Sequence, residues 1–90
     1  MKAYSITYDL KSPNRNYSGL YDAIKATGKW WHYLESTWLV VTDETPQQIW
    51  TRLQPSVDND DNLLIIEVKN NAQGWLPKEA WDWINVNITP

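Results

Sequence analysis

Hydrophobic and polar positions alternate over residues 2–10, which is the pattern of a β-strand with one buried side. The hydrophobic side of this strand consists of Tyr4, Ile6, Tyr8 and Leu10. The opposite side consists of Ala3, Ser5, Thr7 and Asp9. We therefore expect the aromatic side to pack beneath helices and the opposite side, which ends in a carboxylate, to face solvent or a partner.

Three later segments have helical spacing. Residues 17–27 repeat hydrophobic side chains every three or four positions, which predicts the first helix. Thr45 and Gln48 have the spacing of a capping box, so they predict the start of a second helix that extends to Pro55. Residues 77–85 predict a short third helix, and the residues after it are expected to form a tail.

Further strands are predicted between and after these helices. Residues 30–34 and 37–42 are aromatic and β-branched runs on either side of Glu35 and Ser36, which indicates a hairpin. Residues 63–68 are hydrophobic on both sides, so we expect them to form a central strand of the sheet.

The predicted order is β-α-β-β-α-β with an added C-terminal helix, in one domain of 90 residues. This is the order of the ferredoxin-like fold, an α+β fold in which two helices cover one face of a four-stranded antiparallel sheet. The other face must then meet water or a partner. One pair of hairpin rings, either Trp31 with Tyr33 or Trp30 with His32, is expected on that open face.

The composition is unusual only in its aromatic residues. The chain has seven Trp, five Tyr and no Phe, and such rings either build a small core or anchor an interface. It has no cysteine, so a disulfide framework and a thiolate metal site are excluded. Because it shows neither a membrane-spanning apolar run nor an N-terminal signal sequence, we expect a cytoplasmic protein without a membrane partner.

The charge is distributed unevenly along the chain. The net charge is -3, but residues 1–29 are basic on balance and residues 30–90 are acidic. Strong nucleic-acid binding usually needs a basic balance, so any phosphate contact is expected in the N-terminal third. The candidate nucleic-acid or ligand-binding residues are Lys11, Arg15, Lys25 and Lys29, together with the rings of Trp31 and Tyr33.

Two other motifs have simpler structural interpretations. Residues 58–62 are similar to the start of a calcium loop, but Leu63 and Lys69 stand where glycine and glutamate are needed. We therefore expect a solvated turn. His32 is the single histidine and lies between aromatic residues, so we expect a packed side chain rather than a catalytic base.

Asp9 is the candidate catalytic and metal-binding residue. A strand-end carboxylate on the open face can ligate a hard divalent cation such as Mg²⁺ or Mn²⁺. One carboxylate is a poor site, but a two-fold dimer that pairs open faces would bring two together. The alternative is that Asp9 caps the loop over residues 11–16.

Several segments resemble a known family. They are residues 5–10, the helix end at Gly28, the turn over 35–37 and residues 60–66. These segments resemble the Cas-two superfamily, the small ferredoxin-fold subunits of CRISPR adaptation, together with their VapD toxin relatives. The Trp-rich residues 30–40 and 74–83 are similar to the SinR-like small bacterial and phage proteins within it. The resemblance covers nearly the whole chain.

This resemblance implies a homodimer that packs through its open sheet faces. It also implies one of two activities, because some relatives are metal-dependent nucleases that use the aspartate corresponding to Asp9. Others use the dimer only as a scaffold for nucleic acid and partner proteins in bacterial or phage defence.

Three function classes follow. The first is a homodimeric binding or scaffold module whose partner is nucleic acid, a nucleotide or a defence-system protein. The second is a nuclease that uses Asp9 from both subunits with Mg²⁺ or Mn²⁺. The third is a protein that binds or sequesters a small nucleotide by stacking a base on its rings.

Overall fold

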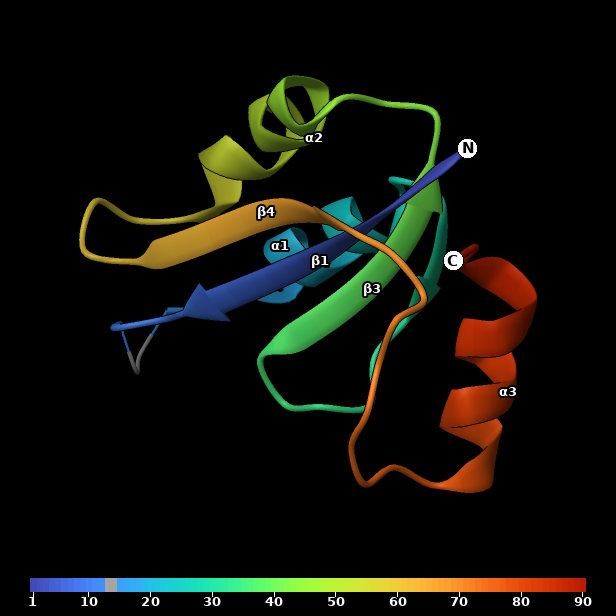
Figure 1. Cartoon of the computed structure of the whole chain (residues 1–90). Helices are drawn as coiled ribbons and strands as arrows, with labels where there is room; N and C mark the ends of the chain where they lie inside the picture. Colours follow the sequence, from blue (N-terminus) through green and yellow to red (C-terminus); the bar gives the residue numbers. More distant parts are fainter. Residues whose placement is uncertain (13–14) are drawn as a thin grey trace.

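A computed structural model describes residues 1–12 and 15–90, which form one four-stranded antiparallel sheet and three α-helices. The strands are β1 (Lys2–Asp9), β2 (Lys29–Trp31), β3 (Thr37–Thr42) and β4 (Asn62–Val68). The helices are α1 (Ser18–Lys25), α2 (Pro46–Leu53) with a 3-10 turn at Gln54–Ser56, and α3 (Lys78–Asn87). The strands lie in the order β2-β3-β1-β4 (Figure 1). The expected α+β class is confirmed.

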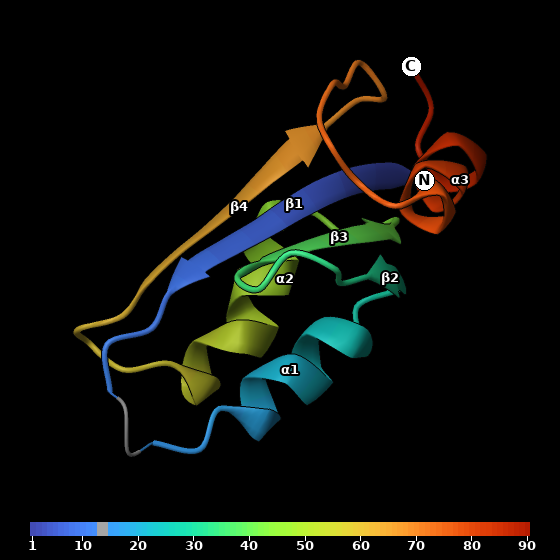
Figure 2. The same cartoon turned by 90° about the horizontal axis from the view of Figure 1, so that it is seen from below.

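The helices divide between the two faces of the sheet. α1 and α2 lie side by side on one face, which we call the helix-covered face (Figure 2). α3 lies on the opposite side, at the end of the sheet where β1 begins, and we call that side the second face (Figure 2). Two helices therefore cover one face of the sheet, and one helix lies at one end of the other face.

The main core lies between the sheet and α1 and α2. Its buried side chains come from the sheet and from both helices: Tyr4, Ile6, Tyr8, Leu20, Ile24, Trp38, Val40, Ile49 and Leu53. The alternation in β1 is confirmed, because Tyr4, Ile6 and Tyr8, on its predicted aromatic side, are the residues of that strand in this core. Ile49 of α2 is fully buried in this core, whereas the neighbouring Trp50 is only half-buried.

Trp38 organises the aromatic packing of the hairpin. His32 stacks on its ring with 3.8 Å between centroids, and Trp30 packs against it at 5.3 Å. These two residues therefore lie toward the helix-covered face, and the expectation of a packed histidine is confirmed. Trp31 and Tyr33 stack on each other instead, with 5.6 Å between centroids. Because β2 ends at Trp31, the first strand of the hairpin is shorter than predicted.

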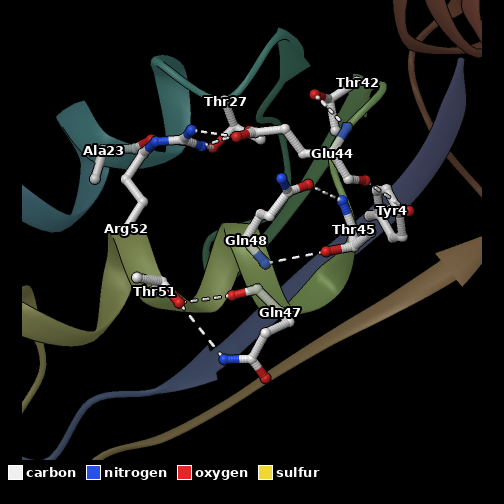
Figure 3. Close-up of polar contacts among 10 residues, drawn as sticks. All are labelled: Tyr4, Ala23, Thr27, Thr42, Glu44, Thr45, Gln47, Gln48, Thr51 and Arg52. Carbon is white, nitrogen blue, oxygen red and sulfur yellow. Dashed lines mark hydrogen bonds and ion pairs between the residues drawn. The ribbon is translucent and has the colours of Figure 1, made fainter.

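Polar contacts cap the start of α2 and link its last turn to Glu44, before the helix, and to Thr27, after α1 (Figure 3). The predicted capping box is present: Thr45 Oγ1 accepts from the Gln48 amide at 3.2 Å, and Gln48 Oε1 accepts from the Thr45 amide at 2.8 Å. Arg52 donates to both carboxylate oxygens of Glu44, at 2.7 and 2.5 Å, and to Thr27 Oγ1 at 3.0 Å. The hydrogen bonds from Arg52 hold the pKa of Glu44 below its usual value.

The α1–β2 connection needs a glycine. α1 ends at Lys25 rather than at the predicted position 27, and Gly28 leads into β2. A Cβ atom at Gly28 would collide with the backbone carbonyl of Val41 on β3. The absence of a side chain therefore allows β2 to approach β3 closely.

The prediction that residues 63–68 form a central strand is wrong. β4 pairs only with β1 and lies at the edge of the sheet. Leu63 and Ile65 pack against the main core, but Leu64 and Ile66 are 56% and 52% exposed on the second face. The strand is hydrophobic on both sides although only one of its sides is covered within this chain.

α3 is longer than predicted and covers one end of the second face. Ile84 and Ile88 are buried against Ala3 of β1 and Val41 of β3. Two expectations are therefore corrected: Ala3 is buried rather than open, and Ile88, placed in a free tail, is part of a second core. The Asn70 amide donates a hydrogen bond to the Thr89 carbonyl at 2.9 Å. This bond holds the C-terminal residues beside the end of β4.

The two tryptophans around α3 differ in burial. Trp81 packs against the second core, whereas Trp75, in the loop before α3, is 99% exposed. Trp83 also packs against this core.

We expect Trp81→Ala to lower the melting temperature by several degrees, because truncating a packed aromatic side chain typically costs about 3–5 kcal/mol when fully buried. Trp75→Ala is the matched control and should melt like the wild type. Thermal unfolding followed by circular dichroism measures both. Equal melting temperatures for the two variants would show that α3 contributes nothing to stability through Trp81.

Candidate functional site

Asp9 lies at the end of β1 and is exposed. Its Oδ2 atom forms an ion pair with Lys11 Nζ at 2.7 Å, and this hydrogen bond raises the pKa of Lys11. Across the strands Asp9 lies opposite Asn62 of β4, next to a shallow hollow of about 300 Å³ that also includes Thr7 and Leu64. Asp9 is therefore accessible, but its charge is already matched by a lysine of the same chain.

No group of three or more metal-ligating His, Asp or Glu side chains gathers within residues 1–12 and 15–90. Within one chain, Asp9 would be one carboxylate ligand, with the Asn62 side chain on the adjacent strand as a candidate second oxygen ligand. A divalent cation at this position would depend on a second copy for further ligands. The paired-carboxylate site thus stays a prediction that rests on the dimer.

The segment over residues 58–61 is a turn whose carboxylates hold the loop that follows β1. Arg15 forms an ion pair with Asp58, which also accepts from Ser12 Oγ at 3.0 Å. Asp61 accepts from Tyr17 OH at 2.9 Å and from the Lys11 amide at 2.8 Å. The turn predicted here is confirmed, and its acidic side chains act as anchors for the loop.

Asp61 has a perturbed pKa. Partial desolvation opposes its ionisation, but hydrogen bonds from the amides of Asp58 and Lys11 and from the Tyr17 hydroxyl favour the charged form. The nearby Arg15 charge acts in the same direction. Together these contacts outweigh the desolvation and hold the pKa of Asp61 below its usual value.

The four basic candidates fall into two groups at opposite ends of the molecule. Lys11 and Arg15 lie beyond the end of β1 and are paired with acidic residues. Lys25, at the end of α1, lies over the ring of Trp30 with 5.1 Å to the centroid. Lys29 is the first residue of β2 and pairs with Val41 of β3, which pairs in turn with Ala3 of β1. Ala3 lies about 20 Å along the strand from Asp9, so Lys29 is at the far end of the sheet from Asp9. The structure does not bring these four residues into one basic rim.

The ring candidates lie together. Trp31 is half-buried opposite Leu39 of β3, and Tyr33 stacks on it and is 57% exposed. Because Leu39 lies on the second face, the open question about the hairpin is answered in favour of this pair. The rings form an aromatic surface at the β2 edge of the second face.

Sequence reasoning predicted an open face with Ser5 and Thr7 but missed that β4 contributes exposed hydrophobic side chains to it. Two rows of side chains cross it: Leu39, Ser5 and Ile66 in one, Thr37, Thr7 and Leu64 in the other. We call these six residues the open half-face. Residues 63–68 are hydrophobic on both sides, and this pattern could have indicated an exposed apolar strand. It was interpreted instead as a strand buried in the middle of the sheet.

No protein-family model, characterised protein or solved structure matches this chain. The resemblance to the Cas-two superfamily therefore stays a prediction, and the site must be argued from its own geometry. Among the described residues, no helix has both the length and the apolar character needed to cross a membrane.

The anchoring role of Asp61 gives a pH prediction. Its pKa in the folded state lies below the unfolded value, so its contribution to stability is complete above about pH 4 and is lost as the pH falls through the folded pKa. We expect Asp61→Asn to destabilise the protein at pH 7 and to approach wild-type stability as the pH falls below the folded pKa of Asp61. Urea unfolding at several pH values measures this convergence.

The matched control is Asp60→Asn, which removes an exposed carboxylate from the same turn. It should parallel the wild type across the pH range. If Asp61→Asn also paralleled the wild type, the hydrogen bonds to Asp61 would not stabilise the folded chain.

Proposed function

We propose that this chain is a homodimeric binding module of the ferredoxin-like class that pairs two copies through their open half-faces. The class is supported by the β-α-β-β-α-β order and by the strand order β2-β3-β1-β4 with antiparallel neighbours. The dimer is supported by one observation above all: Leu64 and Ile66 are exposed side by side in the open half-face, where the polar residues are Ser5, Thr7 and Thr37.

A second copy suits this surface because the surface carries no net charge. The six residues of the open half-face are neutral, and Asp9, the carboxylate that follows on the same side of β1, is paired with Lys11. Two copies related by a two-fold axis can therefore meet without like-charge repulsion. Burying Leu64 and Ile66 against their counterparts would remove apolar area from water at roughly 25 cal/mol per Å².

The available area indicates how stable such a dimer is. The molecule extends 35 by 26 Å across its broad face, and α3 covers one end of that face. A standard interface buries about 600–1,000 Å² on each partner, so the uncovered part reaches at most the lower end of this range. We therefore expect a dimer that dissociates on dilution.

The dimer would present two aromatic surfaces to a partner. Trp31 and Tyr33 border the open half-face at the β2 edge, so a two-fold dimer sets one such pair on each protomer beside the interface. Exposed rings can stack nucleic-acid bases or anchor a protein partner. A scaffold role in bacterial or phage defence, as the Cas-two resemblance implies, is compatible with this arrangement.

The dimer is tested by replacing one apolar residue of the open half-face with a charge. We expect wild-type protein at about 100 µM to scatter light with a mass well above that of the 10.6 kDa monomer. Ile66→Lys should remain monomeric at the same concentration, because lysine on an edge strand is tolerated by the fold but opposes apolar contact.

Ala26→Lys is the control, since it adds the same charge at an exposed position after α1, on the other side of the molecule. It should associate like the wild type. A wild-type protein that stays monomeric at this concentration, or an Ile66→Lys variant that still associates, contradicts the proposal.

The nuclease remains a second candidate because Asp9 lies one row beyond Thr7 and Leu64, at the border of the open half-face. Pairing of open half-faces can therefore bring two Asp9 side chains near each other. If this candidate is correct, Asp9→Ala abolishes cleavage of RNA or DNA in Mg²⁺ or Mn²⁺ and preserves the dimer. Equal cleavage by wild type and variant, or no cleavage by either, removes the nuclease and leaves the binding module.

A further inference from the structure

We propose that a pocket between the start of β1 and the end of α3 binds a small molecule that carries a phosphate group. The pocket has a volume of about 340 Å³ and is partly enclosed. Figure 2 shows how it arises: the N-terminus, the C-terminal segment and α3 come together at one end of the sheet. This site lies in one chain and does not depend on the proposed dimer.

Lysines from three different segments line this pocket. Lys2 begins β1, Lys29 begins β2, and Lys69 directly follows β4. Glu67 is the only acidic side chain among the described lining residues, and its contact with Lys2 is long, at 3.9 Å. In a protein with a net charge of -3, this is a local excess of positive charge.

The remaining basic residues are engaged elsewhere, and this contrast makes the pocket distinctive. Arginines and lysines outside it pair with carboxylates: Lys11 with Asp9, Arg15 with Asp58, Arg52 with Glu44 and Lys78 with Asp82. Lys25 lies over a tryptophan ring. Within residues 1–12 and 15–90, Lys29 and Lys69 take part in no ion pair, so their charges are available to an anion.

The walls of the pocket indicate the size and character of the ligand. Val41 and Val68 form an apolar floor on the sheet, and Val86 lines the pocket from α3. Asn87 and Thr89 add polar groups. The volume lies at the lower end of the range for ligand pockets, about 300–1,000 Å³. A phosphate ester of a sugar or a nucleoside matches these walls, since lysines bind phosphate as point charges and the valines can contact the attached group.

The C-terminal wall is held in place by contacts to the end of β4. The Asn70 amide donates to the Thr89 carbonyl at 2.9 Å, and Asn70 Nδ2 donates to Asn85 Oδ1 at 2.9 Å. Ile88 is buried between them and the sheet. The pocket is therefore formed before any ligand arrives, which lowers the entropic cost of binding.

The test is a titration followed by backbone amide chemical shifts. The probes are adenosine monophosphate, inorganic phosphate and succinate, at constant ionic strength. We expect adenosine monophosphate to cause saturable shifts at Val41, Val68 and Val86. The double variant Lys29→Gln/Lys69→Gln should bind at least about tenfold more weakly, because it loses two charge-assisted contacts. Lys78→Gln, which changes an exposed lysine at the start of α3, should bind like the wild type.

Each probe separates one alternative. If inorganic phosphate binds as tightly as adenosine monophosphate, the pocket binds free phosphate. If inorganic phosphate binds more weakly, the ligand of the pocket is a phosphate ester. Succinate that binds as tightly as either phosphate overturns the assignment of phosphate. The pocket itself is refuted by the absence of saturable shifts, by shifts confined to Trp31 and Tyr33, or by a double variant with unchanged affinity.

Discussion

The packing of α3 against one end of the second face is the constraint on which both proposed surfaces depend. Ile84 and Ile88 bury Ala3 and Val41, so the rows of the sheet nearest the start of β1 are covered within the chain. Leu39 of β3 still packs against this second core, but α3 leaves the β4 side of the sheet uncovered, where Leu64 and Ile66 remain exposed. One helix thus divides a single sheet face into a covered end, whose rim forms the lysine-lined pocket, and an open half-face.

The charged residues at the two ends of the sheet make different kinds of contact. Beyond the end of β1, Lys11 and Arg15 pair with acidic side chains and stabilise the loop. At the covered end, Lys29 and Lys69 lie beside a pocket with a single acidic lining residue among those described. The neutral open half-face lies between these regions. An acidic protein can in this way carry a local anion site and an uncharged surface for self-association.

Local patterns predicted the parts of the fold that depend on neighbours in sequence. The alternation in β1 and the capping box of Thr45 and Gln48 both involve residues a few positions apart, and both are confirmed. The position of β4 was mispredicted because two hydrophobic sides describe a central strand and an edge strand with an uncovered side equally well. The pairing of Arg15 with Asp58 joins residues 43 positions apart, which no local pattern reports.

The central claim is that the open half-face is buried by a second copy. An isotope-filtered nuclear Overhauser experiment on a mixture of labelled and unlabelled protein tests it directly, because it detects only contacts between chains. The account predicts intermolecular contacts from the methyl groups of Leu39, Leu64 and Ile66. The absence of such contacts at a concentration where the protein associates, or intermolecular contacts only from methyl groups on the helix-covered side, would contradict it.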